Sequence, residues 1–395
     1  MPTPPLTVAW FSYFPVEWLP GAPEEVRRLP RLHPASWQRV LLEELENNPA
    51  VKLHVVVLRK QFARNLTFVR NGVTFHLIKT IGGLRGPTLF WLDTWLIRRK
   101  LAEIKPDVVH AWGTEQGAGL VARRLKYPYV VTVQGLLTWY AELVELNHYQ
   151  RFAMRLEKWS LPCAPVVTTE STFAVDYIRQ RWPRANVRQV EHAPDWIFHR
   201  LERKPQAGPL RFLYVGSISR IKGSDLLLRA LDRLKDELPF ELVVVGKPEG
   251  EEMERIRREL SEGLWRRIQF KQDLAPAQIA EELMAATMML FPTRADTSPN
   301  SVKEAAVAGV PVVASAVGGI VDYIWPGRNG FLFPSENLDE FIAAIRRACS
   351  DPRFRAGLVE PAALEQARDY LSPRRMGKGF LEIYQGLAGG AGGSA

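Results

Sequence analysis

The sequence predicts an α/β protein of two domains, each with a mostly parallel sheet covered by helices on both faces. Three observations predict this class. The chain has 395 residues, enough for two domains of ordinary size. Short apolar, β-rich runs alternate with segments whose apolar residues recur at helical spacing. The alternation stops once, at the charged, Pro- and Gly-containing stretch 201–211, and then restarts.

In the first half, apolar runs rich in β-formers predict strands at 6–14, 51–58, 73–79, 106–112, 129–135 and 165–171. Segments such as "SWQRVLLEELENN" and "QGAGLVARRLKY" lie between them and predict helices. Strands that are joined through helices pair in parallel, so one mostly parallel sheet is expected here.

In the second half, strands are predicted at "RFLYVGSI", "FELVVVGK", "RIQFKQ", "TMMLFPT", "VPVVASA" and "NGFLF". The helices between them are "DLLLRALDRLKDE", "EMERIRRELSE", "PAQIAEELMAA" and one that starts near Ser301. This pattern predicts a second α/β domain. Open parallel sheets bind ligands beyond the carboxyl ends of their strands, so the site is expected at those ends.

The composition, with 46% hydrophobic and 24% charged residues, is that of a soluble globular protein. The net charge is +9, and residues 1–200 hold 26 Lys and Arg against 17 Asp and Glu. Residues 201–395 hold 26 of each, so all the excess lies in the first half. The basic half predicts attraction to anionic lipid or to an acidic acceptor, and scattered solvated charge is the alternative. No nucleic-acid-binding motif is present, so no nucleic-acid partner is expected.

No run of 18 uncharged apolar residues predicts a membrane span. The start of the chain lacks the basic region of a secretory signal, so a cytoplasmic protein is expected. Cys163 and Cys349 lie far apart and have no partner at metal-ligand spacing. They are interpreted as two idle thiols, and no metal site is predicted.

The stretch "FPTRADTSPNSVKEAAVAGVPVVASAVGGIVD" begins at residue 291 and places an acid on each side of a Pro-Asn-Ser turn. Ser301 and Glu304 fit the capping-box pattern, so a helix is predicted from about 301 to a stop at Gly309. Capping alone is the simpler interpretation of Glu304. The turn also places free backbone N–H groups at a strand end, where an anion is expected to bind.

The stretch "LYVGSISRIKGSDLLLRAL", residues 213–231, predicts a strand that ends at Gly216 and a helix that starts near Ser224. The loop between them carries Arg220, Lys222 and Gly223. A mobile cation near a helix start suits a diphosphate. The loop is not a Walker loop, which needs a different spacing.

These stretches together resemble the family-4 glycosyltransferases, which are retaining, sugar-nucleotide-dependent enzymes of the GT-B fold. The resemblance spans most of the chain and is strongest over 213–333, and "KPDVVHAWGTEQGAGLVARRLKYPYVVTVQG" carries it in the first half. It implies two Rossmann-like domains that face a central cleft, with a C-terminal helix that crosses back to the first domain. The implied parts are an acceptor-side domain at 1–200, a linker at 201–211, a nucleotide-sugar domain at 212–370, a crossover helix at 371–388 and a disordered tail at 389–395.

The resemblance also implies roles for the two acids. The family carries a Glu-x7-Glu pair, and this chain has Asp296 and Glu304 at that spacing. Glu304 would hydrogen-bond the ribose, and Asp296 would lie beside the donor sugar. Lys222 would neutralise the diphosphate leaving group, so no metal ion is required. The acids are then anchors for a sugar nucleotide and not the acid/base pair of a glycosidase.

The implied catalytic residues are Asp296, Gln134 and Lys222. The implied donor-binding residues are Gly216, Ser217, Arg220, Lys222, Pro299, Asn300, Ser301 and Glu304. No cofactor is expected, because the nucleotide sugar is a substrate.

The chain departs from the family pattern at four places. Ser217 stands where many members have Arg, Gln134 where many have His, and Asp296 where the first Glu lies. The usual Asn-Gly before the hinge is replaced by "EHAPDWIF", residues 191–198. Each change keeps some polar capacity, which favours an active enzyme over an inactive relative.

The acceptor side is less clearly marked. Trp10, Trp18, Trp37, Trp112 and Trp139 lie near predicted strand ends or in loops, where they either stack on a sugar or pack in the core. Glu115 is expected to face the cleft, and His110 to pack within its strand.

The predicted function is transfer of a hexose-type sugar to a saccharide, to a lipid-linked acceptor or to a polysaccharide precursor. Peripheral contact with the inner face of the membrane is expected. Two alternatives stay open: a non-catalytic sugar-nucleotide-binding relative and a sugar-nucleotide epimerase of the same fold. An NAD-dependent oxidoreductase is disfavoured, because no strand is followed by G-x-G-x-x-G.

Overall fold

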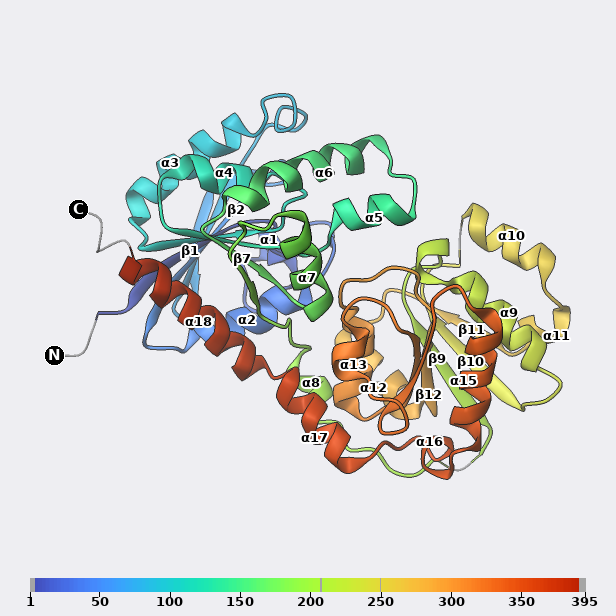
Figure 1. The fold of residues 1–395 in the computed structure, drawn as a ribbon. Helices are drawn as coiled ribbons and strands as arrows, with labels where there is room; N and C mark the ends of the chain where they lie inside the picture. Colours follow the sequence, from blue (N-terminus) through green and yellow to red (C-terminus); the bar gives the residue numbers. More distant parts are fainter. Residues whose placement is uncertain (1–3, 207, 249, 391–395) are drawn as a thin grey trace. The chain divides into compact units, whose positions relative to one another are not determined.

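A computed structural model describes residues 4–206, 208–248 and 250–390 (Figure 1). The chain divides into two compact units. The first comprises the chain up to Glu170, Ala174–His192, and the chain from Pro373 onward; the second comprises Ser171–Phe173 and Ala193–Ser372. Each unit contains one sheet with helices around it, so the predicted α/β class with two parallel-sheet domains is confirmed.

The sheet of the first unit has the strand order β3-β4-β2-β1-β5-β6-β7-β8. Its strands are β1 (Leu6–Ser12), β2 (Val51–Arg59), β3 (Leu66–Arg70), β4 (Val73–Lys79), β5 (Val108–Trp112), β6 (Tyr129–Thr132), β7 (Val166–Thr169) and β8 (Val187–Gln189). All neighbouring pairs are parallel except β3 with β4. Central strands such as β5 are buried on both faces, and this explains their continuous apolar runs.

The helices of the first unit are α1 (Glu24–Arg27), α2 (Ser36–Glu46), α3 (Trp91–Ile104), α4 (Ala118–Leu125), α5 (Leu137–Leu143), α6 (His148–Ser160) and α18 (Pro373–Gly390). Helix α7 (Thr172–Arg181) lies in this unit except for its first two residues, and the 3₁₀ turns are η1 (Val16–Trp18) and η2 (Leu161–Cys163). Asn147 caps α6 in a capping box with Gln150.

The sheet of the second unit has the order β11-β10-β9-β12-β13-β14, and every neighbouring pair is parallel. Its strands are β9 (Leu210–Val215), β10 (Phe240–Val245), β11 (Ile268–Lys271), β12 (Met288–Phe291), β13 (Val312–Ser315) and β14 (Gly330–Phe333). Numbered within the unit, this is the doubly wound order 3-2-1-4-5-6, which reverses between β9 and β12.

The helices of the second unit are α8 (Trp196–His199), α9 (Ser224–Leu234), α10 (Glu251–Glu259), α11 (Glu262–Trp265), α12 (Pro276–Ala285), α13 (Asn300–Ala308), α14 (Ile320–Tyr323), α15 (Leu338–Ser350), α16 (Pro352–Arg355) and α17 (Pro361–Tyr370), with the 3₁₀ turn η3 (Arg220–Lys222). Helix α9 buries Leu227, Leu231 and Leu234 on one face, at the spacing of an amphipathic helix.

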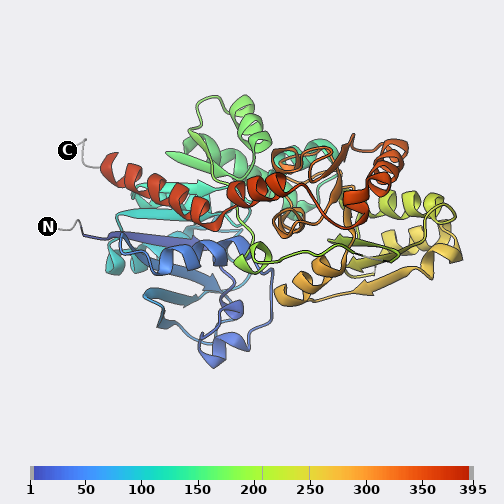
Figure 2. The same ribbon diagram turned by 90° about the horizontal axis from the view of Figure 1, so that it is seen from below.

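Helix α18 belongs to the first unit although it follows the second unit in the chain. It lies against α2, β1 and β5, and Figures 1 and 2 show it beside α2. The hydroxyl of the buried Tyr384 accepts a hydrogen bond from Trp10 Nε1 (3.0 Å) and lies 2.7 Å from His110 Nδ1. The helix runs to Gly390, beyond the predicted end at 388, and the rest of the predicted tail lies outside the described residues.

The stretch 201–211, predicted as a linker, is held to the second unit. The Arg203 guanidinium donates to the carbonyls of Gly357 (2.7 Å), Ala286 (2.5 Å) and Leu283. Strand β9 begins within this stretch, at Leu210. The stretch therefore forms part of the second unit's framework.

Candidate functional site

The predicted donor-site residues lie on two loops at the carboxyl ends of neighbouring strands in the second unit. Strand β9 pairs with β12 through Leu213 and Met289, so the loops 216–223 and 292–299 start side by side. This is the point at which the strand order reverses, and loops there diverge and leave room for a ligand.

Two glycines, one before α9 and one after β13, allow neighbouring backbone to approach the loop 292–299 closely. Gly223 has φ +71°, and a Cβ placed on it would lie 1.8 Å from the Pro292 carbonyl oxygen. Gly318 has φ +56°, and its Cβ would lie 1.8 Å from the Asp296 carbonyl oxygen. Only glycine fits at either position, because any side chain would strike backbone atoms that cannot move aside.

Lys222 and Asp296, predicted from separate motifs, form an ion pair between Nζ and Oδ2. The Asp296 carboxylate is largely buried, and the lysine is partly exposed at the end of η3. The ammonium group has three donors, so it can hold Asp296 and still donate to a second anion. The structure therefore brings together two of the three predicted catalytic residues.

Arg294, which the sequence did not single out, fixes the loop that carries Lys222. Its guanidinium makes a two-bond pair with Asp225 (2.6 and 2.9 Å), and its backbone N–H donates to the Ile221 carbonyl (2.8 Å). It also donates to the Arg220 carbonyl and to Glu336. Burial acts to raise the Asp225 pKa, but the hydrogen bonds and charge of Arg294 lower it overall.

Ser217 and Arg220 occupy the exposed part of this loop. The Tyr214 hydroxyl donates to the Ser217 carbonyl (2.9 Å), which leaves the exposed Ser217 side chain near Ser219. The Arg220 side chain is exposed and has no hydrogen bond or ion pair within the described part of the chain. Gly216 donates its N–H to the Val245 carbonyl (3.0 Å), which keeps the start of the loop on the sheet.

Helix α13 starts at Asn300, with Pro299 at its N-cap and no capping side chain. The predicted capping box of Ser301 with Glu304 is therefore wrong. The physical reason is that the helix starts one residue earlier than predicted, so Ser301 lies inside its first turn. The helix ends at Gly309 (φ +76°), as predicted.

Glu304 lies on α13, one turn from the helix start, and is half-buried. Burial raises its pKa to about 8, nearby Asp195 adds to the increase, and Lys303 opposes it. Its carboxyl group makes no hydrogen bond or ion pair to any residue that the structure describes. Because it does not cap the helix, the carboxyl group can accept a hydrogen bond from a ligand hydroxyl.

Asp195 is a second residue that the sequence did not single out. It caps α8, accepting a hydrogen bond from the Ile197 N–H (3.0 Å), and α8 packs on α13. This packing places its carboxylate near Glu304, 109 positions along the chain, a proximity that no local pattern reveals.

Gln134, the third predicted catalytic residue, belongs to the first unit and follows β6. With Glu115, Trp37 and Trp112 it lines a cavity of about 440 Å³. Glu115 lines this cavity of the first unit, and the expectation that it faces the cleft stays a prediction. His110 lies inside its strand, fully buried, and contacts Thr132 Oγ1 (2.6 Å), as expected.

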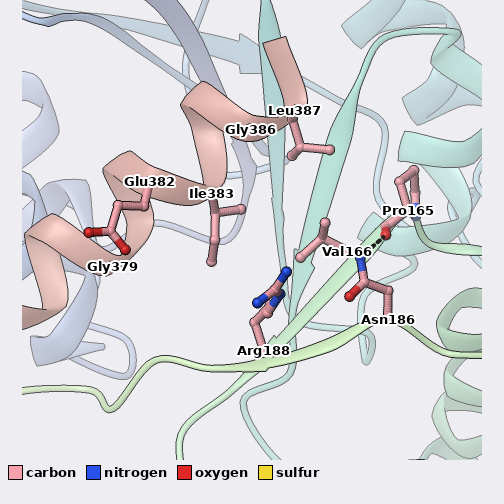
Figure 3. A pocket seen from close by; sticks show the side chains of 9 residues that line it. All are labelled: Pro165, Val166, Asn186, Arg188, Gly379, Glu382, Ile383, Gly386 and Leu387. Atoms are coloured by element: carbon pink, nitrogen blue, oxygen red, sulfur yellow. Dashed lines mark hydrogen bonds between the residues drawn. The ribbon is translucent and has the colours of Figure 1, made fainter. Parts of the chain in front are cut away.

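Another cavity of the first unit, of about 470 Å³, lies between α18 and the strands β7 and β8 (Figure 3). Its lining includes Arg188 and Glu382, and Asn186 donates to the Pro165 carbonyl (3.0 Å) on the wall opposite α18. None of the predicted site residues lines it.

The described residues lack two features that would indicate metal binding or a membrane span. They contain no group of three or more His, Cys, Asp or Glu side chains that could hold a metal ion. No helix among them combines the length and apolar character needed to cross a bilayer.

Comparison with known proteins gives the family. The family description "Glycosyltransferase Family 4" matches residues 38–195, and "Glycosyl transferases group 1" matches residues 209–351. The chain belongs to the family-4 glycosyltransferases. The two matches together cover most of the chain, one in each half.

Curated relatives of this glycosyltransferase include the D-inositol 3-phosphate glycosyltransferases of Corynebacterium urealyticum and Catenulispora acidiphila. The first is 28% identical over 181 residues, covering 44% of this chain and 42% of the relative. The second is 31% identical over 166 residues, covering 38% of this chain and 39% of the relative. The matched region therefore spans about two fifths of the length of these relatives.

Solved structures share the fold along the whole chain. Sucrose-phosphate synthase from Thermosynechococcus elongatus has a TM-score of 0.78 at 18% identity, with 98% of this chain and 100% of that chain covered. HepE from Anabaena in complex with UDP-glucose has a TM-score of 0.69 at 15% identity, with 96% and 100% covered. The fold of this chain is the GT-B fold.

Proposed function

We propose that the protein is a retaining glycosyltransferase that moves a hexose-type sugar from a nucleoside diphosphate to a saccharide, lipid-linked or polysaccharide-precursor acceptor. The observation that carries the proposal is the meeting of Lys222 and Asp296 beside the uncapped start of α13, at the point where the strand order reverses. A cation and free helix-start N–H groups are the partners that a diphosphate needs.

Each donor-site residue has a part in this proposal. Lys222, Arg220 and the first N–H groups of α13 stabilise the negative charge that develops on the diphosphate as its bond to the sugar breaks. Asp296 orients Lys222 and binds hydroxyls of the donor sugar. Glu304 binds the ribose, since a half-buried carboxyl without a protein partner gains a hydrogen bond from a hydroxyl pair.

The chemistry proposed is transfer with retention and without a metal ion. The bond between the anomeric carbon and the phosphate oxygen breaks, and the acceptor oxygen bonds to the same face of the sugar. The acceptor proton passes to the departing diphosphate, so atoms and charge balance. HepE, whose structure was solved in complex with UDP-glucose, is a protein of this fold that binds such a donor.

The first test is a thermal-shift screen with UDP, GDP, ADP and their hexose conjugates. One family of donors should raise the melting temperature, and Lys222→Ala and Asp296→Ala should lose that increase. Lys204→Ala, which removes an exposed lysine of the same unit, should retain it. Retention of the increase by both site variants would show that the donor site lies elsewhere.

Turnover decides between this proposal and its alternatives. Sugar transfer with the same anomeric configuration, measured by NMR and unaffected by EDTA, is expected. A non-catalytic binding protein, suggested by Ser217, Gln134 and Asp296, would show the thermal shift without turnover on any acceptor. An epimerase would convert a single donor into its epimer without an acceptor.

A further inference from the structure

The cavity that Gln134 lines lies at the point where the strand order of the first unit reverses. Strands β1 and β5 are neighbours there, and the cavity is lined by Tyr13 after β1, Glu115 after β5 and Gln134 after β6. It thus occupies the position at which open parallel sheets bind ligands.

The lining of this cavity suits a neutral ring that carries hydroxyl groups. Its walls include Tyr13, Trp37 and Trp112, and among the described residues no Lys or Arg lines it. Over Gly113, the carboxylate of Glu115 and the amide oxygen of Gln134 converge, 2.5 and 3.3 Å from the position that a Cβ would take. Aromatic faces with a few fixed polar groups are the usual partners of sugar rings.

Several polar groups of this cavity have no protein partner. The indole N–H groups of Trp37 and Trp112 and the amide nitrogen of Gln134 are buried without a hydrogen bond within the described ranges. Burial raises the Glu115 pKa, which favours the uncharged carboxyl. Buried donors without partners are costly, and a hydroxyl-bearing ligand would satisfy them.

A second cavity, of about 290 Å³, adjoins the first and is basic where the first has no cationic lining. The two share Tyr13, Leu32 and Gln116 in their linings. Arg59, Lys60 and Arg85 line it, and no acidic side chain does.

The three cations differ in how they are paired. Arg59 pairs with Glu17 and Arg85 with Asp93, both from outside the lining, whereas Lys60 has no partner among the described residues. This cavity therefore suits a phosphate group.

Exposed apolar side chains begin at the rim of the second cavity. The rim includes Gly82 and Gly83, and the flanking Ile81 and Leu84 are 61% and 45% exposed. The series continues through Leu89 (40%), Trp91 (56%) and Trp95 (56%). These five residues form the apolar surface of the first unit.

Basic residues border the apolar surface, and one of them contacts its members directly. Arg124 lies over the Trp91 ring (4.2 Å) and donates to the Leu89 carbonyl (2.6 Å), and Arg98 donates to the Arg124 carbonyl (2.8 Å). On α3, Trp91 and Trp95 are followed on the outward face by the exposed Arg98 and Arg99. Tryptophan beside arginine is the composition that binds the interface of an anionic bilayer.

The backbone holds these side chains outward. Leu89 (φ +45°) and Phe90 (φ +61°) are consecutive residues in the left-handed region, which L-residues other than glycine rarely adopt. Phe90 is buried against Gly117, where a Cβ would lie 2.4 Å from its ring, while Leu89 and Trp91 on either side are exposed. Strained backbone of this kind occurs preferentially at functional sites, which is consistent with a binding surface here.

We propose that the first unit binds an acceptor in which a saccharide is joined through phosphate to a lipid. The sugar occupies the aromatic cavity, the phosphate contacts Lys60 and Arg85, and the lipid lies along the apolar surface where it meets an anionic membrane. The inference rests on the proposed transferase function and selects among its acceptors, because only this class has the three parts in the order in which the surfaces occur.

The first experiment tests the apolar surface by flotation of the full chain with vesicles. Phosphatidylcholine vesicles with added phosphatidylglycerol should recover the protein, and phosphatidylcholine alone should recover much less. Trp91→Ser with Trp95→Ser should lower the apparent affinity about tenfold or more. Arg98→Gln with Arg99→Gln should lower it about fivefold for each charge removed.

Two matched controls accompany these variants. Arg257→Gln with Arg258→Gln removes two consecutive exposed arginines from α10 of the second unit. Val69→Ser removes an exposed apolar side chain of β3. Val69 pairs with Thr74 near the start of β4, whereas the apolar surface begins after the end of β4. Both should bind vesicles as the unchanged protein does.

The second experiment tests the phosphate and sugar cavities by calorimetric titration with three probes: a dodecyl phosphohexose, the dodecyl hexoside without phosphate, and the free hexose 1-phosphate. The first should bind tightest. Lys60→Gln should remove the preference for it over the hexoside. Lys52→Gln, at the opposite end of β2, should keep that preference.

The proposal is overturned if the three probes bind equally, or if vesicle recovery is the same with and without anionic lipid. It is also overturned if the tryptophan variant changes only a monomer–dimer equilibrium, since a second copy of the chain would then cover the surface. The nucleotide thermal shift should persist in every variant named here. If the unchanged protein shows no thermal shift with any nucleotide, the proposed function itself is contradicted.

Discussion

Glu304 shows how packing sets the protonation of a single residue. It is half-buried, it lies near Asp195, and its pKa is raised to about 8. A carboxyl group whose pKa is raised in the folded state contributes stability below its unfolded pKa, near 4.5, and loses it as the pH rises through about 8. The free energy of unfolding is therefore lower in alkaline solution, where the buried Glu304 carboxyl group is charged.

Replacement of Glu304 by Gln should remove this pH dependence. At pH 8.5 the variant should melt at a higher temperature than the unchanged protein, by about 2 to 4 °C for each 1 kcal/mol recovered. At pH 5, close to the unfolded pKa, the difference should be much smaller. Scanning calorimetry at both values measures the difference. A variant that is equally or less stable at pH 8.5 would show that the Glu304 carboxylate is not penalised.

The loop after β9 holds Lys222 in place because it packs closely against the loop after β12. Gly223 allows this loop to lie against Pro292 at the end of β12, and Arg294, two residues further along, bonds to Asp225 and to the loop backbone. Lys222 is thereby presented beside Asp296 by backbone that has little freedom to shift.

Gly223→Ala should therefore displace the loop and abolish the donor-induced thermal shift. Gly327→Ala is the matched control, because Gly327 has a similar φ (+76°) but nothing within 4 Å of the added Cβ. Both variants carry backbone strain, so the difference between them measures the contact with Pro292. Equal donor binding by the two would mean that the loop tolerates displacement.

One buried hydroxyl, that of Tyr384, joins helix α18 to side chains of β1 and β5. Tyr384→Phe would leave the Trp10 N–H and a ring nitrogen of His110 buried without partners, at a cost of about 1–3 kcal/mol for each group. The melting temperature should fall by several degrees in thermal denaturation. Tyr149→Phe, at an exposed tyrosine, should leave it unchanged. An unchanged melting temperature for Tyr384→Phe would mean that a water molecule replaces the hydroxyl and bonds to Trp10 and His110.

At the scale of the whole molecule, the donor should order one unit and leave the other alone. Hydrogen exchange with and without the nucleotide that gives the largest thermal shift should slow for amides of 216–223 and 299–304. Amides of β3 should exchange at an unchanged rate. Protection that appears only in the first unit would contradict the assignment of the donor to the second.

The periodic part of the molecule could be predicted from the sequence, because buried parallel strands are continuous apolar runs. Strand β4 was predicted over its full range, 73–79, whereas β3 at 66–70 was missed. The residues of β3 alternate between half-buried and exposed, so no apolar run marks this antiparallel edge strand. Strand β8 spans only Val187–Gln189 and is too short to form a pattern.

The candidate site divides in the same way. Lys222 and Asp296 could be found because each belongs to a motif on a loop that follows a strand. Arg294 with Asp225, and Asp195 beside Glu304, could not be found, because these contacts depend on how distant elements pack. Helix α13 is predicted with the wrong cap, because the capping pattern makes Ser301 the N-cap and the true N-cap, Pro299, lies two residues earlier.

The placement of α18 has a consequence for the order in which the protein is made. The second unit, apart from Ser171–Phe173, is one continuous stretch that emerges from the ribosome before residue 373 does. The first unit must wait for its last helix while its neighbour is synthesised, with Trp10 and His110 still lacking the tyrosine that joins them. Translation that stops early would therefore damage the half of the protein that was made first.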